Sequence, residues 1–439
     1  MDGFVSGEHA STHQAFFESP RDESIISSTR RTAHTTTSDL SVKPMIFDIG
    51  TEMNEFLDLD TVMLSGQVSI RQIKTNLTEG EITKTTSLML CNYFPAALFK
   101  SIDIFCDQKK ISDTSDLYHY KAYIETLLSA DYGYKSHNLQ NALWYDDAPG
   151  HQETADIQIN PGGFYRQSLA RQGVFDFTIP IHADLFRCTK YFPDMMWLQL
   201  RLNRNIDSLP LIYTPTDDVA SYEISFLKCE VLVTRIRLKD KYYTEYKKLY
   251  DRKGQITLPI SRSVLQMHTL NRQSKEVRIH ACINGQKPVK SFVMLVAPER
   301  YNGAAQVSPF KFQHFNLEAA HMYCDGLQIP SIPYTFDMTK GLFTQAYQGL
   351  MDTLGINVMG HDIGISKAKY EKDCFILGFD FYSDATLGIM THPKESGVAD
   401  LYLRFSSTQA SGVVQLIIYN LYENNIFITQ ERKLSYDFN

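Results

Sequence analysis

Residues 106–113, CDQKKISD, precede YKAYIETLL at 120–128, and the chain repeats this arrangement as CDGLQIPS at 324–331 and AYQGLMDTL at 346–354. Each copy follows a strand-like run with a Cys-Asp pair, a turn, and then apolar residues at helical spacing. Because the same series of elements occurs twice in the sequence, the chain is predicted to contain the same structural unit twice.

One further block, and the residue-by-residue match of the two helical segments, support an internal duplication. The strand-like segment LQLRL at 198–202 matches LYLRF at 401–405, and the helical residues 124–127 match 351–354. The blocks keep one order in both halves, and the offset between them changes only inside connections, where insertions are tolerated. We therefore expect two tandem copies of one unit.

The composition favours β structure. Of 439 residues, 12% are aromatic, and large flat side chains suit pleated, half-buried surfaces. The formal net charge of −7 provides no overall basic field for nucleic acid. With about eight short strands in each copy, the sequence predicts an all-β fold of two tandem eight-stranded jelly-roll β-sandwiches, with short helices in the connections.

The cysteines predict a reduced protein without a disulfide framework. None forms a C-x-x-C, and most lie in apolar runs, where a thiol acts as a small hydrophobe. No charged-then-apolar leader opens the chain, and no run of about 18 apolar residues occurs. We expect neither secretion by the usual route nor a membrane span.

Changes in texture along the chain predict four segments. Residues 1–43 are rich in Ser, Thr and His and poor in aliphatics, and we expect a flexible N-terminal arm. Strand-like runs fill 44–238, the expected first jelly roll, and 255–439, the expected second. Between them, 239–254 is predicted to be a linker helix. The long polar connection 134–172 is interpreted as a functional or external excursion.

The linker helix has two expected faces. Tyr243, Tyr246, Leu249 and Tyr250 lie at helical spacing and should share one packed face. The segment 235–253 carries eight Lys or Arg against three acids, a composition also found in nucleic-acid contacts. A solvated basic face explains it better, although that face could point toward a packaged polyanion.

Candidate chemical groups have simpler structural explanations. His182 and Cys188 in HADLFRC could be half of a metal or nucleophile site, but a loop histidine and a buried thiol fit better. Asp58 and Asp60 alternate with leucines, which indicates the solvated face of a strand rather than a carboxylate pair.

Recognisable catalytic motifs are missing from the sequence. No phosphate loop, G-x-S-x-G elbow or H-E-x-x-H occurs, and GHDIG at 360–364 follows no convincing strand. His9 and His13 fit two solvated histidines of the arm better than a metal pair. We therefore predict no catalytic residue, no cofactor, no metal site and no enzyme activity.

Three segments carry a family resemblance. SIDIFCDQKKIS at 101–112, YKAYIETLL at 120–128 and LWYDD at 143–147 resemble the first jelly roll of the hexon-type major capsid proteins of Polinton (Maverick) elements and adintoviruses. Later segments, including 309–331 and 413–428, fall in that family's order. The arm has no counterpart there, and the 134–172 connection departs most.

The resemblance implies a structural protein. Homotrimers would form pseudo-hexagonal capsomers of six similar sandwiches, and capsomers would build an icosahedral shell around double-stranded DNA. Implied partners are neighbouring capsomers and penton or minor capsid proteins, with non-specific contact to packaged DNA. The implied location is the virion capsid, after assembly in the host nucleus or cytoplasm. The connections 134–172 and 355–368 would project as towers from one end of the sandwiches.

Other functions stay open at this level. A ligand- or carbohydrate-binding β-sandwich would be a monomer with a concave aromatic patch. A single-jelly-roll vertex (penton) protein disagrees with the internal repeat and the length. A jelly-roll enzyme would need clustered His and Glu metal ligands, whereas the 13 histidines here are scattered.

Overall fold

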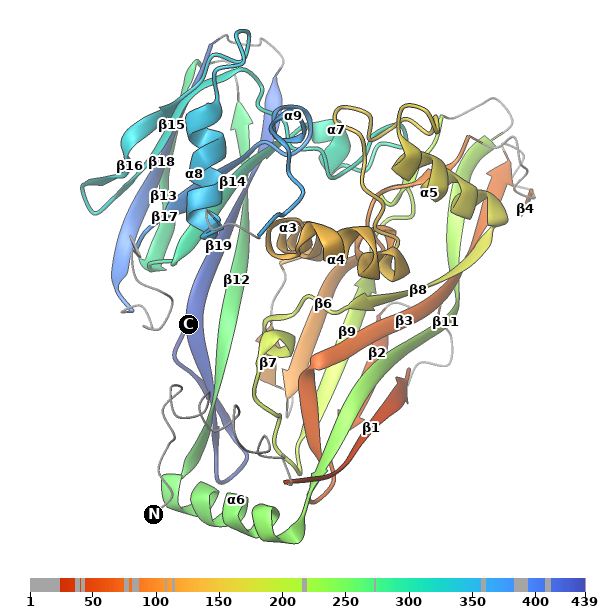
Figure 1. The fold of residues 1–439 in the computed structure, drawn as a ribbon, viewed down its shortest axis with the longest axis vertical. Helices are drawn as coiled ribbons and strands as arrows, with labels where there is room; N and C mark the ends of the chain where they lie inside the picture. The colour runs from red at the N-terminus through yellow and green to blue at the C-terminus, as the bar shows by residue number, and fades with distance from the viewer. Residues whose placement is uncertain are drawn as a thin grey trace, which may run out of the picture.

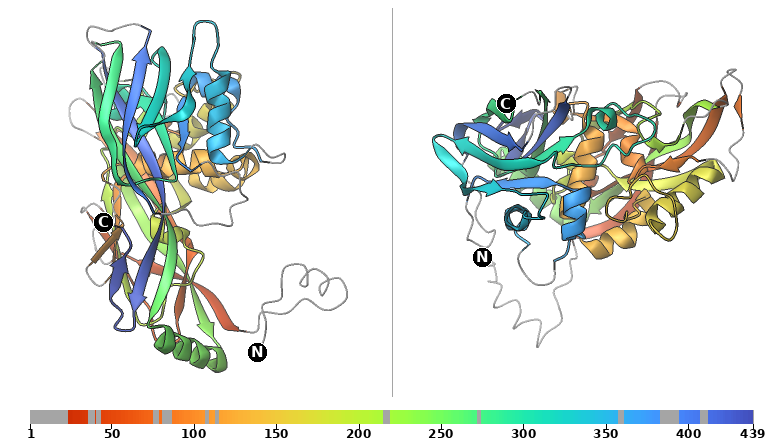
Figure 2. Two further views of the ribbon diagram at one scale, coloured as in Figure 1. Left: turned by 90° about the vertical axis from the view of Figure 1, so that its left-hand side faces the viewer. Right: turned by 90° about the horizontal axis from the view of Figure 1, so that it is seen from above.

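The computed structural model describes residues 24–35, 40, 44–74, 79–80, 87–106, 109–112, 115–214, 219–271, 274–356, 361–382, 394–406 and 412–438. These residues form long antiparallel sheets in two halves that stand side by side (Figure 1). Figure 2 shows that most helices gather on one side of the sheets.

The first half contains two main sheets. One sheet runs in the order β1-β11-β3, with β8 and the short β4 also paired to β3: β1 (Ile25–His34), β11 (Val219–Leu238), β3 (Phe56–Lys74), β8 (Val174–Pro180), β4 (Glu79–Gly80). The other runs β2-β9-β6-β7: β2 (Met45–Gly50), β9 (Trp197–Arg204), β6 (Phe99–Cys106), β7 (Lys109–Ser112). Burial alternates along β2 and β9, so one face of this sheet packs into the core. A short pair accompanies them: β5 (Met89–Leu90), β10 (Leu211–Ile212).

The second half repeats this topology. One sheet runs β12-β19-β14-β17, with β20 paired to β19: β12 (Gln255–Asn271), β19 (Val413–Thr429), β14 (Lys290–Val296), β17 (Ile376–Asp380), β20 (Leu434–Tyr436). The other runs β13-β18-β15-β16: β13 (Glu276–Gln286), β18 (Ser396–Phe405), β15 (Leu317–Cys324), β16 (Leu327–Thr335).

Both halves are jelly rolls. Each half of the described structure has eight principal strands when the short β4, β5, β10 and β20 are left aside. Numbered along the chain, they lie side by side in the order first, eighth, third, sixth in one sheet and second, seventh, fourth, fifth in the other, which is the jelly-roll order. In the described part of the chain, every strand pair joins strands of the same half. The predicted double jelly roll is confirmed, and a single jelly roll is excluded.

The repeated sequence blocks fall in equivalent strands, but one of them is two residues out of register. Cys106 pairs with Leu198, whereas Cys324 pairs with Ala399 rather than with Leu401, the residue that the matched blocks would place there. Because side chains alternate along a strand, a two-residue displacement keeps the same inward face. Sequence matching could not detect it.

The expectation of a flexible arm over 1–43 is wrong for residues 25–34. These residues form β1, the first strand of the first jelly roll, which pairs with β11 from Ile25 opposite Leu238 to His34 opposite Glu230. β1 is an edge strand with mostly exposed side chains, so backbone pairing orders it without the aliphatic residues that the sequence analysis required. Residues 1–23, 36–39 and 41–43, and with them His9 and His13, lie outside the described residues.

The predicted linker helix is present as α6 (Asp240–Lys253), at the base of the molecule between β11 and β12 (Figure 1). It ends at Gly254, whose φ of 77° suits glycine. Tyr250 is buried and Tyr246 packs edge-on against Phe56 with ring centroids 5.0 Å apart. The prediction for Leu249 is wrong, because this side chain is 46% exposed.

The interpretation of 134–172 as an external polar excursion is also wrong in part. This connection contains helices and buried polar residues, and it packs between the two halves, as described below. Among the residues that the structure describes, the helices besides α6 are α2 (Phe94–Ala97), α3 (Tyr118–Ser129), α4 (Tyr132–Ser136), η1 (Asn138–Ala142), α5 (Pro161–Gln172), η2 (Asp184–Arg187), α7 (Pro298–Tyr301), α8 (Thr344–Leu354) and α9 (Lys367–Lys372).

The apolar core is continuous across both halves, since one cluster of buried side chains includes strands of each. All seven cysteines are buried and free, as expected for small hydrophobes. No helix among the described residues is long and apolar enough to cross a membrane.

Candidate functional site: the junction between the jelly rolls

Helix α3 lies where the two jelly rolls meet (Figure 1). Its residues from Tyr118 to Leu128 are all buried, including Lys121 and Glu125. The apolar spacing of this segment indicates only one packed face. The remaining face is buried because the second jelly roll covers it, which no local pattern could show.

Glu125 is the central polar group of this junction. From its own half, Arg187 Nη2 lies 2.7 Å and His182 Nδ1 lies 2.9 Å from Glu125 Oε2. From the second half, the Ser263 hydroxyl on β12 donates to Glu125 Oε1 at 2.8 Å, and the Tyr419 hydroxyl on β19 donates at 3.1 Å. One carboxylate therefore binds both jelly rolls together.

A second carboxylate completes the cluster. Asp184 accepts a hydrogen bond from Lys121 Nζ at 2.6 Å and another from the backbone N–H of Ser263 at 3.2 Å. Lys121 also lies 4.0 Å from Glu125 one helical turn away. Two buried acids thus face Lys121 and Arg187, and the buried charges compensate one another.

These neighbours set the protonation of the cluster. Burial by itself would raise the pKa of Glu125, but Arg187 and Lys121 outweigh burial and hold that pKa well below its usual range. Burial lowers the pKa of His182 more than its hydrogen bond to Glu125 raises it. The cluster therefore holds a charged Glu125 beside a neutral His182 whose Nε2 lies 2.7 Å from the Tyr93 hydroxyl.

Aromatic stacking adds an apolar part to the junction. The rings of Tyr123 on α3 and Phe310 in the second half are stacked with centroids 4.2 Å apart and an interplanar angle of 3°. Tyr120 stacks on Tyr301 at 6.2 Å. Such pairs stabilise a contact by about 0.5–1.5 kcal/mol beyond the apolar area that they bury.

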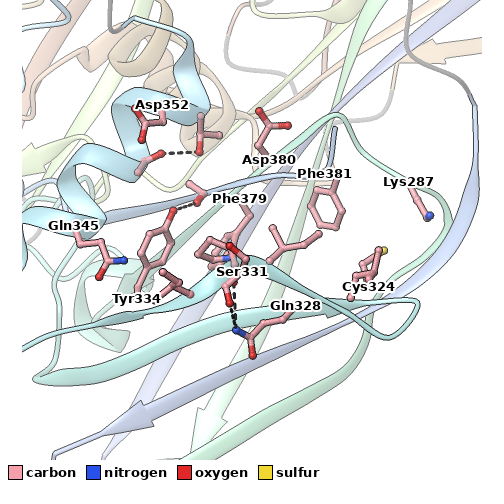
Figure 3. Close-up of a pocket in the computed structure, with 17 residues that line it drawn as sticks. Lys287, Cys324, Gln328, Ser331, Tyr334, Gln345, Asp352, Phe379, Asp380 and Phe381 are labelled. Atoms are coloured by element: carbon pink, nitrogen blue, oxygen red, sulfur yellow. Dashed lines mark hydrogen bonds between the residues drawn. The ribbon is translucent and has the colours of Figure 1, made fainter. Parts of the chain in front are cut away.

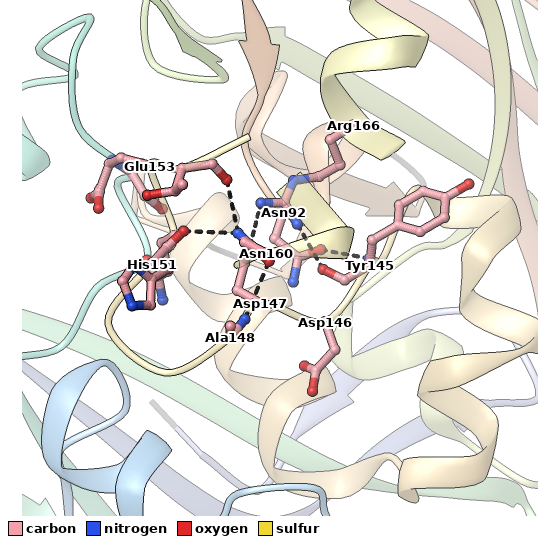
Figure 4. Close-up of polar contacts among 12 residues, drawn as sticks. Asn92, Tyr145, Asp146, Asp147, Ala148, His151, Glu153, Asn160 and Arg166 are labelled. Carbon is pink, nitrogen blue, oxygen red and sulfur yellow. Dashed lines mark hydrogen bonds and ion pairs between the residues drawn. The ribbon is translucent and has the colours of Figure 1, made fainter. Parts of the chain in front are cut away.

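The connection 145–160 is held in shape by a fully buried arginine (Figure 4). Arg166 on α5 donates to the carbonyl of Tyr145 at 2.7 Å and to Asp147 Oδ1 at 2.5 Å. Asn160 donates to the same Asp147 oxygen at 2.8 Å and to the carbonyl of His151 at 2.8 Å. Burial raises the pKa of Asp147, and the positive charge of Arg166 opposes this rise. The guanidinium therefore stabilises the charged form of this buried carboxylate.

This ordered connection then binds the second half. Glu153 pairs with Arg300 and accepts the backbone N–H of Ser308 at 3.2 Å. Asp146 pairs with Lys369 on α9. The excursion predicted to project outward is therefore a bridge between the jelly rolls.

The structure places the candidate residues from the sequence in separate surroundings. His182 belongs to the Glu125 cluster, and its contacts there are with Glu125, Tyr93 and neighbouring polar groups rather than with Cys188, which is buried separately. Asp58 and Asp60 lie on the outer side of β3, with their leucine neighbours buried, as predicted.

Two further predictions concern motifs outside the cluster. Within the described ranges, no three His, Cys, Asp or Glu side chains are grouped to hold a metal ion. In the described part of GHDIG, the carbonyl of Asp362 accepts the backbone N–H of Tyr132 at 2.7 Å and so joins the halves again.

Sequence reasoning missed Glu125 as a functional residue. The available signal was a Lys–Glu pair one turn apart, Lys121 and Glu125, within a helix that is otherwise apolar and aromatic. A charged pair at that place indicates either a solvated face or a buried polar contact. The partners that decide between these, Ser263 and Tyr419, lie far away in the sequence.

No protein-family model matches the sequence. Among curated proteins, the uncharacterised protein F54H12.2 of Caenorhabditis elegans is 22% identical over 284 residues, which is 63% of this chain and 65% of that protein. The chain thus matches less than two thirds of the relative's length.

Solved virus structures share the fold over nearly the whole chain. A chain of the Sputnik virophage superposes with a TM-score of 0.63 at 11% identity, covering 95% of this chain and 90% of that one. The mavirus major capsid protein gives 0.56 at 11% identity, covering 100% and 96%. The Faustovirus major capsid protein gives 0.53 at 9% identity, covering 94% and 92%. This chain therefore has the double jelly-roll fold of viral major capsid proteins.

Proposed function

We propose that this protein is a structural subunit of a viral capsid, a major capsid protein, and not an enzyme. The repeated strand order of the two jelly rolls is the observation that carries the proposal, because it gives one chain two equivalent β-sandwiches. The fold shared with virophage and Faustovirus chains over at least 94% of the sequence supports it.

In this role the chain forms a homotrimer whose six jelly rolls make a pseudo-hexagonal capsomer. Capsomers contact one another and penton or minor capsid proteins in an icosahedral shell around double-stranded DNA, so the protein resides in the virion. Assembly takes place in the host nucleus or cytoplasm. The resemblance of residues 101–147 to the proteins of Polinton (Maverick) elements and adintoviruses supports a capsid of that kind.

The mass and outline of the purified protein test the proposal. Light scattering after size exclusion should give three times the chain mass of 50.3 kDa, and electron microscopy should show particles of hexagonal outline. A stable monomer at micromolar concentration would overturn the capsid role.

A ligand-binding β-sandwich is the second candidate, favoured by one observation. A cleft of about 810 Å³ lies beside α8 and is lined in part by Lys287, Tyr334, Asp352 and Phe381 (Figure 3), within the size range of small-molecule sites. This function predicts a monomer that binds a sugar or another small ligand in a glycan-array or thermal-shift screen. A trimer without such binding would exclude it.

We propose that α6 makes the non-specific contact with packaged DNA. Its lysines Lys241, Lys247, Lys248 and Lys253 are exposed at the base of the molecule (Figure 1). Replacing Lys247 and Lys248 by Glu should weaken binding to duplex DNA and reduce its salt dependence, since each lost phosphate contact lowers the slope by about 0.9. Lys340→Glu, an exposed change elsewhere, is the control. Equal salt slopes for all variants would remove α6 from this role.

A further inference from the structure

The contact inside the chain has two complementary sides. The first jelly roll contributes α3, with Glu125 at its centre, and the second contributes β12 and β19 through Ser263 and Tyr419. Because the two jelly rolls share one topology, each half also contains the counterpart of the side that the other half uses.

Helix α8 is the counterpart of α3. Each helix lies between the fifth and sixth principal strands of its half, and the matched blocks align Glu125 with Asp352 and Lys121 with Gln348. Their surroundings differ sharply. Lys121 and Glu125 are 1% and 2% exposed, whereas Gln348 and Asp352 are both exposed on the surface, where the Gln348 amide donates to Asp352 Oδ1 at 3.0 Å.

The surface around α8 resembles one side of a contact. The cleft of Figure 3 opens between α8, β16 and β17, with Asp352 among its lining residues. On β16, Leu327 is 73% and Ile332 is 67% exposed at this cleft, although both side chains are large and apolar. Exposed apolar side chains beside a polar helix face are typical of an interaction surface.

The other side of the contact is found on β1 and β11. These strands are the counterparts of β12 and β19, since they are the first and eighth principal strands of their half. β12 buries Leu258, Ile260 and Ser263, whereas β1 leaves every side chain from Ser28 to Thr32 exposed. The first jelly roll thus presents, at its surface, the kind of strand face that α3 contacts within the chain.

The charges of the two surfaces are complementary. On the outer face of β1, the face equivalent to that of Ser263 on β12, the strand presents Arg30, while the α8 surface presents Asp352. We infer that the α8 surface, defined by Gln348, Asp352 and the β16 rim, docks on β1 and β11 of a second copy of this chain. The contact repeats between chains the α3 junction that exists within each chain.

This contact is head-to-tail, because it joins two different surfaces, and a rotation that closes after three chains gives a ring. The inference rests on the proposed capsid function and assigns its trimer interface. It also explains why α3 is buried on all sides and α8 on one side only. The second jelly roll covers α3 within the chain, whereas the matching surface for α8 belongs to another chain.

Chemical crosslinking tests the assignment in the full-length protein. Thr32→Cys places a thiol on the outer face of β1, the face that carries Arg30, and Gln348→Cys places one on α8. The seven native cysteines are buried and give little background. With a short bis-maleimide reagent, the double variant should yield covalent dimers and trimers. A mixture of the two single variants, co-assembled before crosslinking, should yield covalent dimers, which shows that the link is between chains.

Two controls make the result specific. Each single variant alone should stay uncrosslinked, because α8 never meets α8 in a head-to-tail ring. Gln348→Cys combined with Glu245→Cys, an exposed position on α6, should also stay uncrosslinked. Trimers by light scattering without the Thr32–Gln348 link, or with links in Gln348→Cys alone, would overturn this interface and leave the capsid function standing. Monomers by light scattering would overturn the capsid function itself.

Discussion

At the scale of single residues, Glu125 shows how one buried charge can define a contact. A carboxylate that is 2% exposed costs several kcal/mol to bury unless it is paired and hydrogen-bonded. Here the compensation comes partly from Arg187 in the same half and partly from Ser263 and Tyr419 in the other. The charge is therefore stable only when the two jelly rolls are docked as observed.

Replacing Glu125 by Gln should destabilise the protein strongly. The change removes the buried carboxylate that pairs with Arg187, whose side chain is 30% exposed, and leaves the buried Lys121 with Asp184 as its remaining acid. Breaking a buried pair in this way costs about 3–5 kcal/mol. Urea unfolding measures the loss. Asp60→Asn, an exposed change on β3, should cost less than about 0.5 kcal/mol. A loss for Glu125→Gln as small as that of the control would show that the junction does not depend on this charge.

His182 should make the free energy of unfolding fall as the pH is lowered. An unfolded histidine takes up a proton below about pH 6.5, whereas burial holds the folded pKa of His182 lower. The folded state therefore binds fewer protons, so the contribution is present above about pH 6.5 and is lost as the pH falls toward the folded pKa. One such group contributes at most about 1.4 kcal/mol per pH unit.

The variant His182→Gln should show a shallower fall of unfolding free energy than the wild type between about pH 6.5 and about pH 5. Cys188→Ala is the matched control from the same loop, since burial raises the pKa of that thiol and it takes up no proton in this window. Parallel pH profiles for the wild type and His182→Gln would contradict the prediction.

At the scale of elements, the sequence could predict what repeats locally. The helix α3, the matched strands β6 and β15, and the linker α6 all carry periodic apolar residues with clear turns around them. Local patterns could not predict β1, because an edge strand gains its order from backbone pairing with β11, which is distant in the sequence. They also could not predict that 145–160 is ordered around Arg166, since its partners are backbone carbonyls and one acid.

A chain that begins at residue 36 should aggregate or give little soluble protein, whereas a chain that begins at Ser24 should not. The shorter chain lacks β1 and exposes the long edge of β11 to pairing with other molecules. Soluble yield and light scattering compare the two. Equal behaviour would show that β1 is dispensable for the first jelly roll.

Gly162→Ala should disrupt the bridging connection. A Cβ at this position would lie 2.1 Å from the carbonyl oxygen of Asp146, a backbone atom that cannot move aside without displacing the whole loop. Gly133→Ala is the milder comparison, because there the nearest atom is a side-chain oxygen at 3.2 Å. We expect Gly162→Ala to lower the thermal midpoint by several degrees more than Gly133→Ala, since about 1 kcal/mol corresponds to about 2–4 °C. Equal midpoints would mean that the loop adapts.

At the scale of the whole molecule, the two jelly rolls share one topology, but helix α3 of the first is covered by the second, whereas helix α8 of the second is exposed on one face. If the α8 surface is the trimer contact, Asp352→Arg should weaken trimers by about tenfold or more, because like charges would then face each other across the interface. Sedimentation at decreasing concentration measures the change. The monomer fold should be retained because Asp352 is exposed. Asp337→Arg, on the loop before α8, is the matched control, and equal dissociation of both variants would contradict the prediction.

The pairing of β1 with β11 also constrains how the protein is made. Leu238 leaves the ribosome roughly 200 residues after its partner Ile25, a delay of about 10–40 s at about 5–20 residues per second. During that time the first sheet of the nascent chain lacks its pairing strand. The second jelly roll has a similar delay, because β12 pairs with β19, which is synthesised after the other strands of its sheet except β20. Newly synthesised chains should therefore be a preferred client of host chaperones.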